Sequence, residues 1–94
     1  MAFTQLLAIG TGAATSSDLT IADGGSSVLV LKGTNGVIPL DCMVHVQAKG
    51  DDSVYYTVDT LHYGKRSFVL DAKGVYRVSR AASSAAVGVT HEAP

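Results

Sequence analysis

The chain has 94 residues, of which 47% are apolar and 16% charged, and its formal net charge is -1. This nearly neutral balance argues against nucleic-acid and anionic-membrane partners, because both require clustered positive charge. A chain of this length supports one domain with one thin core. We therefore expect a single domain spanning residues 1–94, with no nucleic-acid and no membrane partner.

The composition predicts an all-β fold, since ten glycines and many Ser, Thr and Val residues are typical of short strands with frequent turns. Cys42 is the only cysteine, so we expect no internal disulfide, and its apolar surroundings predict a buried thiol. The start MAFTQLLAIG lacks the basic region of a signal peptide. We expect the chain to be made in a reducing cytoplasm and to work docked in an assembly, because low surface charge favours association.

Taken in chain order, alternating apolar residues and turn signals predict seven to eight short antiparallel strands. This pattern is typical of a small immunoglobulin-like β-sandwich or a partly open barrel. The expected strands are residues 3–9, 13–21, 26–32, 41–49, 53–61, 67–71, 75–80 and 87–90.

Three segments do not follow the regular alternation, and we interpret each of them separately. The first strand has two partly apolar faces, so residues 1–12 either belong to the domain's own sheet, which we favour, or form an N-terminal arm that packs on a neighbour. Residues 37–40 contain Pro39, which cannot donate to a strand ladder, and predict a connection that crosses between sheets. Residues 91–94 are expected to be a short C-terminal tail.

Residues 67–80, SFVLDAKGVYRVSR, predict two half-buried strands that meet at a tight turn. Tyr76 follows Asp71 and Gly74, an order that is typical of the tyrosine corner of immunoglobulin-like sandwiches. In such a corner the ring packs in the core and the hydroxyl bonds to nearby backbone. We expect a structural corner at these three residues; an ordinary hairpin tyrosine is the alternative.

The sequence predicts no catalytic, metal-binding or cofactor-binding residues, and we do not expect an enzyme. His45, His62 and His91 lack metal-ligand spacing, and no G-x-S-x-G or phosphate-loop pattern is present. Tyr55 and Tyr63 could form an outward aromatic platform for sugars, but ordinary surface positions or protein contacts are favoured.

Several stretches spread over nearly the whole chain carry a family resemblance. They are QLLAIGTG, ATSSDLTIADG, SSVLVLKG, VHVQAKGDDS, VLDAKGVYRVSR and AAVGVTHE. Together they resemble small virion proteins of tailed bacteriophages, a group that includes capsid decoration (cement) proteins and head or tail accessory proteins. The chain departs from this pattern at Lys73-Gly74, where Pro-Gly is usual, and in its short tail.

The resemblance implies a structural protein on the surface of the phage head that stabilises contacts between major capsid proteins. Its partners would be the major capsid protein or another virion protein, and it would form a homo-oligomer, with a trimer as the first expectation. The alternatives are a neck, tail or head-fibre subunit and a virion-borne glycan-binding module. The candidate protein contacts are Phe3, Leu6, Leu7, Met43, His45, Tyr55 and Tyr63.

Overall fold

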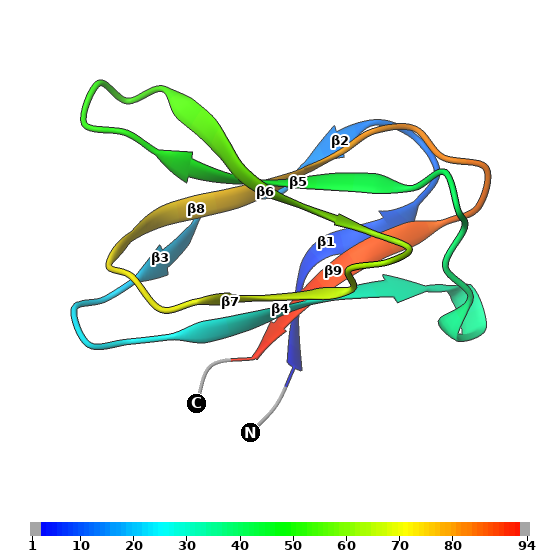
Figure 1. Ribbon diagram of the computed structural model, residues 1–94, viewed down its shortest axis with the longest axis horizontal. Helices are drawn as coiled ribbons and strands as arrows, with labels where there is room; N and C mark the ends of the chain where they lie inside the picture. The colour runs from blue at the N-terminus through cyan, green and yellow to red at the C-terminus, as the bar shows by residue number, and fades with distance from the viewer. Residues whose placement is uncertain (1–2, 93–94) are drawn as a thin grey trace.

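A computed structural model describes residues 3–92 as two antiparallel sheets packed face to face (Figure 1). The first, sheet A, has the strand order β1-β9-β4-β7, and the second, sheet B, has the order β2-β8-β5-β6, with β3 also paired to β8. The expected all-β sandwich is confirmed. The strands of sheet A are β1 (Phe3–Gly10), β4 (Ser27–Gly33), β7 (Ser67–Leu70) and β9 (Val87–Glu92); those of sheet B are β2 (Ala14–Thr15), β3 (Leu19–Ile21), β5 (Met43–Lys49), β6 (Tyr55–His62) and β8 (Gly74–Arg80).

The described residues form nine strands instead of the seven or eight expected, because residues 13–21 form two short strands. The break falls after Thr15, where the Ser16 hydroxyl accepts a hydrogen bond from the Val78 N–H at 3.0 Å. The side chain thus occupies a donor that a continuous strand would bond through its backbone. Local competition of this kind shortens β2 and lets β3 restart against the other end of β8.

The first and the last described strands, β1 and β9, both belong to sheet A. Strand β1 pairs with β9 from Phe3 to Gly10, so these residues belong to the domain's own sheet, as we favoured, and do not form a separate arm. The expected tail is wrong for His91 and Glu92, which extend β9 and pair with both β1 and β4. Residues 1–2 and 93–94 lie outside the described part of the chain.

The connection from β4 to β5 crosses from sheet A to sheet B, as Pro39 predicted. It begins with a single 3-10 turn, η1 (Thr34–Gly36), in which Asn35 and Gly36 have φ values of 55° and 78°. Its middle residues expose Val37 and Leu40, while Ile38 and Cys42 turn into the core. The crossing segment therefore closes one end of the sandwich.

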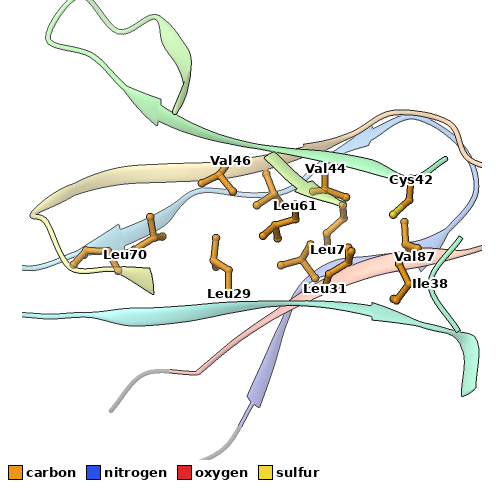
Figure 2. Close-up of a cluster of buried hydrophobic side chains, with 13 residues drawn as sticks. Leu7, Leu29, Leu31, Ile38, Cys42, Val44, Val46, Leu61, Leu70 and Val87 are labelled. Carbon is orange, nitrogen blue, oxygen red and sulfur yellow. The ribbon is translucent and has the colours of Figure 1, made fainter. Parts of the chain in front are cut away.

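The core lies between the two sheets and is built from alternate residues of the central strands (Figure 2). In β4 the burial alternates strictly, with Leu29 and Leu31 inside and Val28 and Lys32 outside. Cys42 is buried as predicted, and removal from water raises the pKa of its thiol. The buried apolar residues are Leu7, Ile21, Leu29, Leu31, Ile38, Cys42, Val44, Val46, Leu61, Leu70, Val78, Val87 and Val89.

Arg80, the last residue of β8, is buried between the sheets with 7% of its surface exposed. Its Nε donates to the Gly12 carbonyl at 2.7 Å, and its Nη1 donates to the carbonyls of Ala8 and Val87 at 2.7 and 2.8 Å. A buried guanidinium requires such partners, because desolvation of an unpaired charge is costly. Arg80 thus joins sheet B to β1 and β9 of sheet A.

Residues 67–80 form a corner between the sheets. Strand β7 pairs with β4 in sheet A and β8 pairs with β5 in sheet B, so the turn between them carries the chain from one layer to the other. The Tyr76 ring packs against the core, and its hydroxyl donates to the Ala72 carbonyl at 2.9 Å. Gly74 begins β8, where an added Cβ would lie 3.4 Å from this ring, and Asp71 is exposed in the turn.

Candidate protein-binding surfaces

The candidate contact residues do not form one surface. Phe3 is exposed on sheet A, whereas Met43 and His45 lie on β5 and Tyr55 on β6 of sheet B. Tyr63 follows β6 in the loop to β7. The structure therefore places Met43, His45 and Tyr55 on one face of sheet B, with Met43 and Tyr55 at opposite ends of the β5–β6 pair, and it spreads the others over different sides of the molecule.

Leu6 and Leu7 are not free contacts. Leu7 is buried, and Leu6 packs against the core beside it. Strand β1 has a register shift between Gln5 and Leu7, which is the signature of a bulge. The bulge breaks the alternation expected for a regular strand, so two successive leucines both contribute to the interior.

The outer face of sheet B carries a connected set of polar and aromatic side chains. The Arg77 guanidinium stacks on the Tyr55 ring, with 3.6 Å between the Arg77 Cζ and the ring centroid, and its Nε donates to the Gln47 amide oxygen at 2.8 Å. The Tyr55 hydroxyl donates to the Asp18 carboxylate at 2.5 Å, and this bond raises the pKa of Tyr55. His45 and Thr60 share a hydrogen bond of 3.0 Å further along the same face. The polar groups of these side chains thus find hydrogen-bond partners within the same face.

Tyr55 and Tyr63 do not form the sugar platform that was considered from the sequence. They stand at opposite ends of β6, which at about 3.3 Å per residue separates them by roughly 25 Å. Each ring also has an arginine over one face, Arg77 on Tyr55 and Arg66 on Tyr63. A sugar would have to displace a guanidinium from either ring to stack on that face.

The end of the β5–β6 hairpin extends beyond the end of β7 (Figure 1). Val54, Tyr56 and Val58 alternate here, and each is about half exposed at 50–52%. Val58 is the extra residue of a bulge, because Val46 pairs with Asp59 and Gln47 pairs with Thr57. We call Val54, Tyr56 and Val58 the hairpin-end surface.

A hollow of about 230 Å³ adjoins the hairpin-end surface between the two sheets. Val58 reaches it from β6, Phe68 from β7 and Tyr76 from β8, and the remaining lining is Ala48, Val69, Leu70, Asp71 and Ala72. Apolar side chains thus continue from the hairpin end into the opening of the sandwich. A contiguous apolar region of this kind is characteristic of protein–protein contact.

The outer face of sheet A is a second apolar surface. Phe3, Val28 and Val69 are exposed there, and Val30 is half-buried among them. Strand pairing places Phe3, Glu92, Val28 and Val69 in one row across the sheet. Val30 lies in the next row, between Thr90 and Ser67. We call Phe3, Val28, Val30 and Val69 the sheet-A face.

Two hydrogen-bonded pairs of titratable groups lie near the two ends of β6. Lys65 donates to the Asp59 carboxylate at 2.5 Å, and this bond, with the Thr60 N–H, lowers the pKa of Asp59. The Tyr56 hydroxyl donates to Asp52 at 2.6 Å, which lowers the pKa of Asp52 and raises that of Tyr56. Within the same residues, no three His, Cys, Asp or Glu side chains gather as metal ligands.

The described residues also contain no helix that is long and apolar enough to cross a membrane. In comparisons with known proteins, no family model, no curated protein and no solved structure matches the chain.

Two features of these surfaces were not predicted from the sequence. The alternation in residues 53–61 was recognised, but not the bulge at Val58 or the overhang of the hairpin end, because both depend on which strands pair. Arg80 was not singled out either. The only available signal was a charged residue in register with the core positions Tyr76 and Val78.

Proposed function

We propose that this protein is a structural subunit that docks on a larger protein assembly, and specifically a capsid decoration protein on the head of a tailed bacteriophage. The sequence resemblance supplies the identity of the assembly. The observation that carries docking is the hairpin-end surface, where three half-exposed apolar side chains adjoin an apolar hollow. Its partner would be the major capsid protein.

Stabilisation of a head would follow from repetition. Each copy needs to bury only a modest interface across the contact between two capsid subunits, and many symmetric copies multiply that small gain. The hairpin-end surface suits such a role, because Tyr56 and Val58 lie on β6, which pairs with β5, and the Val54 carbonyl accepts a hydrogen bond from the Gly50 N–H at 2.8 Å. A rigid surface loses little conformational freedom when it binds.

Binding to heads tests this proposal. The protein would be mixed with expanded heads assembled without it from the major capsid protein of the same phage, and the bound fraction would be measured by co-sedimentation. We expect saturable binding that Val58→Lys weakens at least tenfold, because the new charge would be buried in the contact. Thr57→Lys, at an exposed position on the opposite side of the same strand, should bind like the wild type.

Two outcomes would overturn parts of the proposal. If the wild-type protein fails to bind heads, capsid decoration is wrong. If Val58→Lys binds as tightly as the wild type, the hairpin-end surface is not the contact. Binding of a few copies only would indicate a neck or tail position.

A further inference from the structure

The sheet-A face has opposite charges at its two ends. Val30 and its partner Thr90 lie near the middle. Lys32 lies two residues after Val30 on β4. Val28 lies two residues before Val30, and it is paired with Glu92 of β9. Neither Lys32 nor Glu92 forms an ion pair with another described residue. Lys32 therefore stands at one end of the sheet-A face, and Glu92 lies at the other end, in the row between Phe3 and Val28.

This arrangement is complementary to itself. A two-fold rotation about an axis that crosses the strands at Val30 exchanges the two ends of the face. Lys32 of one copy would then lie above Val28 of the second copy, beside the strand that carries Glu92. An interface between identical subunits related by a two-fold axis requires this kind of self-matching surface.

We propose that two copies of this chain associate face to face through the sheet-A face, with Lys32 of each copy against Glu92 of the other. Stacked sheets lie about 10 Å apart, a distance that a lysine and a glutamate side chain span together. Phe3 of one copy would meet the bulge of β1 in the second copy, where Ile9 is 44% exposed. In this arrangement Lys32 meets Glu92, Phe3 meets Ile9, and the two copies of Val30 meet each other beside the axis.

The shape of the face supports close approach. Phe3, Val30, Lys32 and Thr90 line a shallow hollow of about 190 Å³ into which side chains of a facing sheet could project. The interface would be small, however. Four strands about 4.8 Å apart and about five residues long cover roughly 320 Å² in projection, below the roughly 800 Å² that each partner buries in a standard interface. We therefore expect a weak dimer that forms at micromolar or higher concentration.

Sedimentation velocity of the full chain over a wide concentration range tests the dimer. We expect the average mass to rise from that of one chain towards twice that value. Val30→Lys should abolish this rise, because it places two like charges beside the two-fold axis. Val37→Lys adds the same charge at a position exposed in the crossing segment, outside the face, and should dimerise like the wild type. Thermal unfolding of both variants checks that each is folded.

Charge reversal separates this pairing from a general effect of charge. Lys32→Glu and Glu92→Lys should each raise the dissociation constant about three- to tenfold, since each puts like charges against one another. The double variant should restore most of the affinity. Lys32 and Glu92 lie about four residues apart along the strands of one copy, roughly 13 Å, so the restoration must arise between copies.

Three results would contradict the proposal. The wild-type chain could remain a monomer at all concentrations, or it could form a trimer, the state that the virion-protein resemblance implies. The double variant could also be as weak as the single variants. The solution test needs no capsid, so its outcome is independent of whether the protein binds heads.

Discussion

Arg80 has the most demanding environment of any charged side chain in the described structure. It is buried, yet the partners that its Nε and Nη1 contact are backbone carbonyls and not carboxylates. Three carbonyl dipoles replace the water that the guanidinium loses on folding. Because two of these carbonyls belong to β1 and β9, the same side chain fixes the position of the first strand relative to sheet B.

Replacement of Arg80 by leucine should therefore lower the free energy of unfolding by about 2–4 kcal/mol, because three bonds to a charged donor are lost and buried carbonyls are left unpaired. Urea denaturation measures this change. Arg66→Leu, in the exposed loop before β7, should change stability by less than about 1 kcal/mol. Equal unfolding midpoints for the two variants would show that Arg80 does not tie the sheets together.

Asp59 and Lys65 give the molecule a pH-dependent contact. The bond from Lys65 holds the pKa of Asp59 below its ordinary value of about 3.9. The folded state thus binds this proton less readily than the unfolded state, so the contact stabilises the protein above that value and is lost as the pH falls through the lowered pKa.

We expect Asp59→Asn to be less stable than the wild type at pH 7, and this difference to shrink and then vanish as the pH falls through the lowered pKa of Asp59. Chemical denaturation at a series of pH values measures it. Lys65→Met removes the other partner and should reduce the acid dependence in the same way. If the wild type remains more stable than Asp59→Asn at low pH, the Asp59–Lys65 ion pair is not the source of the stability difference.

Strand β1 lies at the edge of sheet A, and it pairs with β9 through an irregular register. Its register against β9 shifts twice, once around Leu6 and again between Leu7 and Gly10. At the second shift the β1 backbone passes very close to Gly88 of β9, where an added Cβ would lie 2.6 Å from the Leu7 carbonyl oxygen. The absence of a side chain at Gly88 is thus what allows this bulge to pack on β9.

Gly88→Ala should push β1 away from β9 and destabilise its attachment by about 1–3 kcal/mol, as overpacking does elsewhere. Hydrogen exchange should show faster exchange at the β1 amides, with the central strands less affected. Gly12→Ala is the matched control, because no atom lies within 4 Å of an added Cβ there. Unchanged β1 exchange in Gly88→Ala would contradict the close contact.

At the scale of elements, alternation was sufficient to predict the regular strands. Cys42, Val44 and Val46 are buried as the pattern of residues 41–49 indicated, and the Pro39 segment crosses between sheets. The deviations come from bulges and side-chain bonds. Leu6 turns inward at a bulge, and the Ser16 hydroxyl interrupts one expected strand. Such features depend on the partner strand, so a single strand's sequence does not reveal them.

At the scale of the whole molecule, the candidate surfaces arise from how the sheets are offset. Val58 lies on β6 of sheet B and Phe68 on β7 of sheet A, and they line one hollow because the two sheets pack face to face. Phe3 and Val69 share a face because the register of β1, β9, β4 and β7 places both in one row across sheet A. Sequence alternation could identify these residues as apolar, but only the strand order places them together.

The two apolar surfaces would let the protein bind a capsid and a second copy of itself by separate regions. The hairpin-end surface lies at the opening between the sheets, whereas the sheet-A face is the outer side of one sheet. A dimer would thus leave Val54, Tyr56 and Val58 of each copy free for docking, whereas Val69 belongs to the sheet-A face and also lines the hollow beside them.

The most direct test of the central proposal is the number of copies that bind to each expanded, decoration-free head at saturation, together with the temperature at which the heads disrupt. The proposal predicts a copy number that matches the capsid symmetry, in the hundreds for a typical head, and a raised disruption temperature. No binding, or saturation at a handful of copies with an unchanged disruption temperature, would contradict it.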